Sequence, residues 1–159
     1  MSSCFLMHVM SRRRQTGVGL IEVMIAVLVL SIGFLGIAAL QVHALSTNNS
    51  AMARSMATVA SYSILDAMRT DRAAAESGSY DTTVTANACP DAGGSLASNQ
   101  LHNWCEQLSS TLGASANTTG EIACANTGIC TVTIQFDDGR AVQDDNNTNK
   151  VTIVTRAAL

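Results

Sequence analysis

Charged residues are scarce in this 159-residue sequence, since Asp, Glu, Lys and Arg make up 13% of it, whereas about a quarter of an average soluble domain is charged. Basic residues are the scarcer kind. Three of the nine lie within residues 1–17, which contain no acid, so 9 − 3 = 6 basic residues remain against 12 acidic ones. Surfaces that bind nucleic acid are basic because they neutralise phosphates. We therefore expect no nucleic-acid partner.

Proline is almost absent and occurs only at Pro90, outside residues 18–75. Because proline breaks helices, its absence favours one long helix from residue 18 to about residue 75. The second half of this stretch is amphipathic, with apolar residues recurring at steps of three and four. Two such rows are Met52, Met56, Val59 and Ala60, Ile64, Met68.

The first half of the predicted helix is apolar on all sides, and Val23 to Leu40 contain no charged residue. About 20 apolar residues cross the core of a bilayer as a helix. The whole helix would be roughly 85 Å long at 1.5 Å per residue, which is too long for a globular domain of this size. Its apolar half must therefore be buried in lipid, and later against other subunits.

Three arginines, Arg12 to Arg14, precede the apolar stretch. Basic residues beside a membrane span stay in the cytoplasm, so we expect a cytoplasmic N-terminus and an exported C-terminal part. Residues 1–17 read as a short basic leader. The start could also be Met10, because the residues from Met10 to Gly17 form a complete leader by themselves.

Five cysteines are present, and loss of the leader would remove Cys4 and leave four. An even number in an exported domain indicates two disulfides. Three pairings are open, and proximity in the sequence favours Cys89–Cys105 and Cys124–Cys130. The last two cysteines are too widely spaced for a zinc knuckle and no histidine pair accompanies them, so we expect no metal site.

The C-terminal part begins with a predicted loop over residues 77–100. A short helix is expected around Gln100–Leu112. Alternation of apolar and polar residues predicts strands at Glu121–Cys124, Ile129–Phe136 and Val151–Arg156. The expected fold is therefore α+β, with a long N-terminal helix packed on an antiparallel sheet of three or four strands. Four regions follow: residues 1–17, 18–45, 46–76 and 77–159.

The stretch from Gly17 to Val23 reads Gly-Val-Gly-Leu-Ile-Glu-Val and resembles the prepilin peptidase site of type IV pilins and pseudopilins. The resemblance implies cleavage between Gly17 and Val18, N-methylation of Val18, and an assembly role for Glu22, which becomes the fifth residue of the mature chain. A glycine beside the scissile bond leaves the backbone open to a protease. A carboxylate in an apolar helix is costly in lipid, so Glu22 either has a positive partner or lies among the headgroups.

Residues 18–41 further resemble the PilV group of minor pilins. The implied protein is a structural subunit, not an enzyme, and needs no cofactor. The implied partners are prepilin peptidase, other minor and major pilins, the inner-membrane assembly platform and the lipid bilayer. The protein would cross the bacterial inner membrane once, with a periplasmic C-terminal domain, and then enter the pilus. Two residues depart from the pattern: Ala39 replaces a proline of many major pilins, and Val18 replaces the usual aromatic residue or methionine.

Three rival functions stay open. A pseudopilin of a type II secretion system has the same N-terminal design, and a membrane-anchored adhesin or other binding domain would not polymerise. An exported thiol enzyme could use Cys105 with His102, three residues apart on a predicted helix. Disulfide formation is the favoured fate of Cys105.

The polar run 144–149 hints at calcium, but it lacks the glycine and final glutamate of an EF-hand, which favours a solvated loop.

Overall fold

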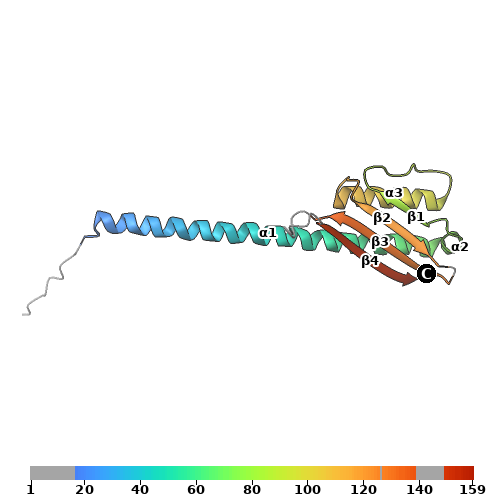
Figure 1. Ribbon diagram of the computed structural model, residues 1–159, viewed down its shortest axis with the longest axis horizontal. Coiled ribbons are helices and arrows are strands. Elements are labelled where there is room, and N and C mark those ends of the chain that lie inside the picture. The colour runs from blue at the N-terminus through green and yellow to red at the C-terminus, as the bar shows by residue number, and fades with distance from the viewer. Residues whose placement is uncertain (1–16, 126, 139–148) are drawn as a thin grey trace, which may run out of the picture. The chain divides into compact units, whose positions relative to one another are not determined.

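The computed structural model describes residues 17–125, 127–138 and 149–159 (Figure 1). The described elements are α1 (Leu20–Thr70), α2 (Arg72–Glu76), β1 (Thr82–Thr85), α3 (Leu96–Leu112), β2 (Thr119–Cys124), β3 (Ile129–Asp137) and β4 (Lys150–Ala158). The chain divides into two compact units, one up to Gln41 and the other from Val42 to Leu159. Helix α1 contributes its apolar half to the first unit and its amphipathic half to the second, which we call the head.

The apolar half of α1 has no covering from the rest of the described chain. Every residue from 17 to 41 is exposed, and an 18-residue window of α1 has a mean hydropathy of 2.8. This is the one helix among the described residues whose length and composition suit a membrane crossing. Ser31, its polar exception, donates a hydrogen bond from Oγ to the carbonyl of Val27 at 2.7 Å. That bond satisfies the hydroxyl without water.

In the head, one face of α1 is buried. Its buried residues are Ser50, Ala57, Ala60, Ser61, Ile64, Leu65 and Met68. The predicted row Ala60, Ile64, Met68 is thus confirmed as a core face. In the other row, Met52 and Val59 point outward, with 59% and 54% of their surface exposed. Periodicity alone could not rank the two rows, because both have helical spacing.

The long helix stops earlier than expected. It ends at Thr70, and the chain bends at Asp71 before α2 continues to Glu76. Two side-chain hydrogen bonds are formed at this point, and the first of them competes for a backbone carbonyl of the helix. The hydroxyl of Thr70 donates to the carbonyl of Ala67 at 2.7 Å, and the carboxylate of Asp71 accepts a hydrogen bond from Tyr80 at 3.2 Å.

The head contains a four-stranded antiparallel sheet in the order β1-β2-β3-β4. Strands that follow one another in the chain are neighbours in the sheet, and α3 lies in the connection between β1 and β2. Cys124 pairs with Cys130 in the β2–β3 register, as a hairpin at this position requires. The α+β fold with a helix on an antiparallel sheet is confirmed. Strand β1 was not predicted, because its sequence shows no alternation of apolar and polar residues. Val84 is the only apolar residue of the four, and it is the one that is buried in the core.

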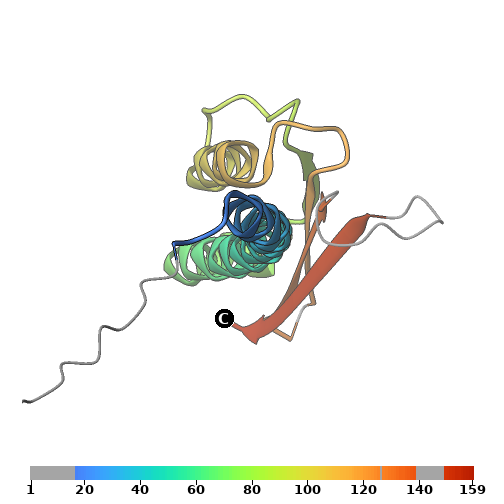
Figure 2. The same cartoon turned by 90° about the vertical axis from the view of Figure 1, so that its left-hand side faces the viewer.

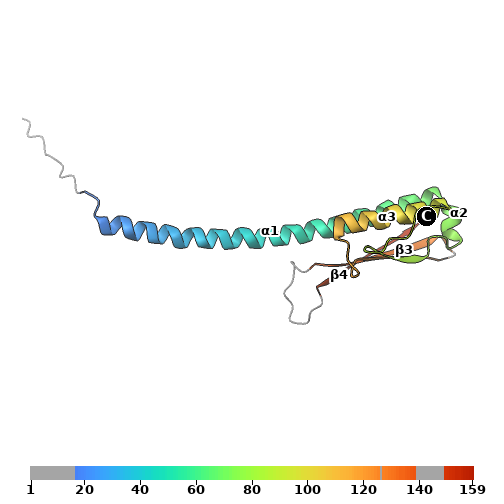
Figure 3. The same ribbon diagram turned by 90° about the horizontal axis from the view of Figure 1, so that it is seen from above.

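Helix α3 and the second half of α1 lie on the same side of the sheet (Figures 2 and 3). Helix α3 begins at Leu96, four residues before the predicted start, because Ser95 caps it by accepting a hydrogen bond from the Ser98 N–H at 3.1 Å. Trp104 is central to the core. Its surface is 3% exposed, and its Nε1–H donates to the carbonyl of Ala60 at 3.0 Å.

Candidate functional site

The Gly17–Val18 peptide bond lies in irregular backbone directly before α1. Residues 17–19 adopt no regular secondary structure, and both Gly17 and Val18 are exposed. The helix starts only after the carbonyl of Gly19 accepts hydrogen bonds from the backbone N–H groups of Glu22 and Val23, at 3.0 and 3.3 Å. A peptidase needs an extended, unpaired segment, because a helical peptide bond is enclosed by its own hydrogen bonds. The bond at Gly17–Val18 satisfies that requirement.

Nothing in the described chain requires residue 17 to be a glycine. A Cβ atom built on Gly17 meets no atom within 4 Å, and its backbone has no positive φ. Gly120 provides a contrast, because a Cβ atom there would lie 2.4 Å from the ring of Trp104. Packing within the described structure therefore does not account for the glycine at position 17.

Glu22 is the only Asp, Glu, Lys or Arg residue between Val18 and Ala53. It lies in the first turn of α1, where a negative charge interacts favourably with the helix dipole. Within the described part of the chain its carboxylate forms no ion pair or hydrogen bond, and the residue is exposed. A charge held at the edge of a fully apolar surface, without an internal partner, is available to an external cation.

Around Glu22, the surface of α1 consists of large apolar side chains. They include Leu20, Ile21, Val23, Met24, Ile25, Leu28, Phe34 and Leu35, each more than half exposed. Soluble monomers rarely expose a contiguous apolar patch of more than a few hundred Å². This half of α1 therefore requires a lipid bilayer, other apolar helices, or both in succession.

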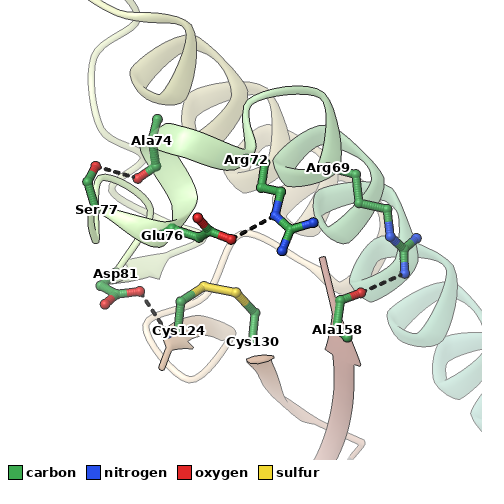
Figure 4. Close-up of a disulfide and its surroundings, with 9 residues drawn as sticks. All are labelled: Arg69, Arg72, Ala74, Glu76, Ser77, Asp81, Cys124, Cys130 and Ala158. Carbon is green, nitrogen blue, oxygen red and sulfur yellow. Dashed lines mark hydrogen bonds and ion pairs between the residues drawn. A yellow bond between two sulfur atoms is a disulfide. The ribbon is translucent and has the colours of Figure 1, made fainter. Parts of the chain in front are cut away.

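Two disulfides stabilise the head. Cys89 is joined to Cys105, and Cys124 to Cys130, which are the pairs that are closest in the sequence. The second closes the β2–β3 hairpin, near the junction of α1 and α2 (Figure 4). There the backbone N–H of Cys124 donates to Asp81 Oδ1 at 2.8 Å. Two short crosslinks in a small exported domain typically add about 2–4 kcal/mol each.

Two arginines, one at the end of α1 and one in α2, lie beside this hairpin (Figure 4). Arg72 pairs with Glu76 at 2.7 Å, and Arg69 donates from Nη2 to the carbonyl of Ala158 at 3.5 Å. Both arginines are substantially exposed, and exposed pairs of this kind contribute little to stability. We regard this cluster as structural.

Sequence reasoning missed a buried polar cluster around Tyr80. This residue is fully buried, and its hydroxyl lies within hydrogen-bonding distance of Asp71 Oδ2 and Gln100 Oε1. Burial, followed by the negative charge of Asp71 and its hydrogen bond, raises the pKa of Tyr80 to about 12. The cluster joins the α1–α2 bend to α3. No sequence signal distinguishes Tyr80 from Tyr62, which is exposed.

The remaining candidates do not form a catalytic site. The sulfur of Cys105 is committed to its disulfide, while His102 Nδ1 lies 2.7 Å from the carbonyl of Pro90, so the thiol–histidine hypothesis is wrong. No group of three or more His, Cys, Asp or Glu side chains suited to a metal occurs among the residues described. The calcium-like run 144–149 lies outside the described residues except for Asn149. The arginines at 12–14 and Met10 also lie outside them.

Comparison with known proteins gives one match. Residues 12–38 match the family described as the prokaryotic N-terminal methylation motif. No curated protein and no solved structure matches the chain. The matched stretch includes Gly17, Val18 and Glu22 together with most of the exposed apolar helix. The chain therefore carries the N-terminal signal of type IV pilin-like proteins, a class that includes both pilins and pseudopilins.

Proposed function

We propose that this protein is a minor pilin, a structural subunit that helps to initiate or build a type IV pilus. Prepilin peptidase cuts the chain between Gly17 and Val18 and methylates the new N-terminus. The mature protein crosses the inner membrane once, with its head in the periplasm. It then enters the filament with other minor and major pilins at the assembly platform.

One observation carries the proposal: an accessible Gly17–Val18 bond stands directly before the exposed apolar half of α1, whose single charge is Glu22. An ordinary membrane anchor needs neither the glycine nor the acid. A filament subunit uses both, because cleavage creates an amine that can neutralise the carboxylate in an apolar setting, where an ion pair is strong. The resemblance of residues 18–41 to the PilV group supports the minor-pilin role.

Intact-mass measurement on protein from native membranes tests the proposal. The mature chain should begin at Val18 and carry one methyl group on its amine. Replacement of Gly17 by a bulky residue such as leucine should leave the precursor uncut, while its insertion into the membrane is unchanged. A mature N-terminus at another position, in cells with active prepilin peptidase, contradicts the proposal.

A pseudopilin of a type II secretion system is the second candidate, favoured by the same N-terminal motif. Deletion of the gene distinguishes the two. A minor pilin is required for surface pili and a pseudopilin for secretion of periplasmic proteins. A membrane-anchored adhesin that never polymerises would be processed without Glu22 playing any part.

A further inference from the structure

The sheet of the head has two edges of different character. Strand β1, at one edge, has four residues, and the carbonyl of Thr85 already accepts a hydrogen bond from the N–H of Ala88 at 2.9 Å. Strand β4, at the other edge, has nine residues, and its register with β3 runs without a break from Lys150 to Ala158 (Figure 2). Of the two, β4 alone presents a long strand edge with which no described strand pairs.

The ladder between β3 and β4 shows which backbone groups of β4 are unpaired. Beyond one end of the strand, the N–H of Leu159 donates to the carbonyl of Gly128 at 2.9 Å. In an antiparallel ladder every second residue pair exchanges hydrogen bonds, so this bond sets the alternation. The residues whose N–H and C=O groups point away from β3 are Lys150, Thr152, Val154, Arg156 and Ala158. Among the described residues only the last has a partner, since its carbonyl accepts from Arg69 Nη2 at 3.5 Å.

The face of β4 that is turned toward the helices is only half covered. Its apolar residues Val151, Ile153 and Ala157 pack against the core but are partly exposed. On the neighbouring strand β3, by contrast, Val132 and Ile134 are fully buried. Apolar side chains of a further strand beside β4 would cover the exposed part of these residues, and burial of apolar surface is favourable by about 25 cal/mol per Å².

The opposite face of β4 is basic. Lys150 and Arg156 are exposed there, and neither forms an ion pair with a described residue. Cross-strand pairs of opposite charge stabilise a sheet, so acidic side chains on a neighbouring strand would be favoured beside both. Natural sheets protect open edges with proline, bulges or charges. Strand β4 has no proline and no bulge, and its two cations flank the uncharged, β-branched run Val151–Thr155 without interrupting it.

A second copy of this chain does not suit the edge. Two β4 strands paired around Val154 would bring Lys150 of one copy diagonally beside Arg156 of the other, within reach of a like charge. The pairing would also make the two α1 helices run in opposite directions, which chains anchored by α1 in one membrane cannot adopt. The β1 edge of a second copy is short, and its Thr85 carbonyl is already bonded.

We propose that β4 is the docking edge for an extended segment of another protein, which adds an antiparallel fifth strand to the sheet. The segment carries acidic side chains on the face of Lys150 and Arg156, and apolar side chains on the face of Val151 and Ile153. In this mode of recognition main-chain hydrogen bonds supply affinity and alternate side chains supply specificity. The proposal rests on the proposed function only for the source of the segment, since a filament brings other subunits to the head.

Peptides test this edge on the full mature chain in detergent micelles. The probe is as long as β4 and blocked at both ends, with valine and isoleucine on one face. The other face has glutamate opposite Lys150 and Arg156, and threonine elsewhere. One control peptide has lysine in place of each glutamate. Two others carry N-methyl groups, either on the amides that face β4 or on those that face away. Fluorescence anisotropy measures affinity, and NMR of the β4 amides locates the site.

The acidic peptide should bind and shift the amide signals of Thr152 and Val154. The lysine peptide, and the peptide methylated on the side that faces β4, should bind more weakly by about tenfold or more, because each loses a favourable charge pair or hydrogen bonds. Methylation on the far side should change the affinity little. Equal binding of the acidic and lysine peptides, or of the two methylated peptides, overturns the proposal.

Val154→Pro removes an N–H that points away from β3, so the sheet should tolerate it, while the acidic peptide should bind about tenfold more weakly. Val154→Thr keeps the N–H and is the matched control, and urea unfolding followed by the fluorescence of Trp104 checks that both variants fold. Arg156→Glu leaves the backbone unchanged and should weaken binding of the acidic peptide while strengthening that of the lysine peptide. Binding of the acidic peptide that is unaffected by Arg156→Glu contradicts the proposal.

Self-association of the mature chain that Val154→Pro abolishes would make a second copy the occupant and would also overturn the proposal. A chain that binds the acidic peptide but never enters pili would instead contradict the proposed function and leave the docking edge intact. A chain that enters pili normally but does not bind the peptide would contradict the docking edge alone. The two proposals therefore fail separately.

Discussion

Gly17 and Gly120 show two different reasons for a glycine in one chain. Gly17 has open space where a side chain would lie, so the described structure sets no requirement at that position. At Gly120 the backbone of β2 is in contact with the ring of Trp104, and a Cβ atom would also lie 2.8 Å from Leu108. The structure therefore gives Gly120 a role in folding, whereas the role proposed for Gly17 is in processing.

Gly120→Ala should destabilise the head by about 1–3 kcal/mol, because overpacking forces neighbouring side chains out of position. The ring of Trp104 cannot move freely, since its Nε1–H is bonded to Ala60. Urea unfolding followed by the fluorescence of this single tryptophan measures the loss. Gly17→Ala is the matched control and should unfold like the unmodified chain. Equal stability of the two variants would show that the core has room that the structure does not indicate.

Glu22→Ala tests whether the carboxylate takes part in assembly. Alanine suits an apolar helix better than glutamate does, so the variant should be cleaved and inserted into the membrane normally. It should nevertheless be depleted from sheared filaments, because the amine freed at Val18 loses its partner. Ser31→Ala is a suitable control, since the Ser31 hydroxyl bonds only to the backbone of its own helix. Incorporation of Glu22→Ala at the normal level would refute the pairing role.

Tyr80 should make the head sensitive to alkaline pH. Its pKa in the folded chain is raised to about 12, above the value of about 10 expected for an unfolded chain. Its contribution to stability is therefore complete below pH 10 and is lost as the pH rises toward 12. Urea midpoints measured at pH 9 and pH 11.5 should fall more steeply for the unmodified chain than for Tyr80→Phe, which cannot ionise. Parallel curves would show that Tyr80 does not titrate in this range.

At the scale of single elements, the two disulfides should differ in their effects. The Cys89–Cys105 bond spans a sequence separation of 16 and the Cys124–Cys130 bond one of 6. In the loop-entropy model the longer loop contributes about 3 kcal/mol and the shorter about 2. Cys105 and Cys130 are both completely buried, so a serine in either pair would place a hydroxyl in the core, and the loop length is what separates the two.

We therefore expect the paired variant Cys89→Ser, Cys105→Ser to lose more stability than Cys124→Ser, Cys130→Ser in the same urea assay. Peptide mapping without reductant should recover the remaining disulfide in each case. A larger loss from the hairpin pair would mean that the β2–β3 turn depends on its crosslink more than its loop length implies.

Sequence patterns predicted the elements that are long or regular. The strand at Ile129–Asp137 was found almost to the residue, because buried Val132, Ile134 and Phe136 alternate with polar neighbours. Strand β1 was missed, since its pairing with β2 lies in backbone hydrogen bonds that composition does not reveal. The start of α3 could have been found from Ser95, a good N-cap residue, followed by Leu96. The bend at Asp71 is accompanied by a hydrogen bond from Tyr80, nine residues further on, which helical periodicity does not reveal.

The candidate site was predictable to the extent that it is local in sequence. Gly17, Val18 and Glu22 lie within six residues, so one motif identifies all three. The buried contact between Ser50 of α1 and Asp138, which directly follows β3, was not predictable from the sequence around either residue. Only the folded head brings Ser50 to Asp138, which is 88 residues away in the sequence.

For the molecule as a whole, the placement of its covalent crosslinks has a mechanical consequence. Neither disulfide includes a residue of α1. In a filament under tension, load would enter the head through this helix, which is held along the sheet by the packing of Ala57, Ala60 and Ile64 and not by a disulfide. The two disulfides instead stabilise α3 and the β2–β3 hairpin, against which α1 would pull. Mechanical unfolding of the head would then begin with α1 sliding along the sheet. Such a shear loads all the packing contacts of the helix at the same time, instead of breaking them one after another.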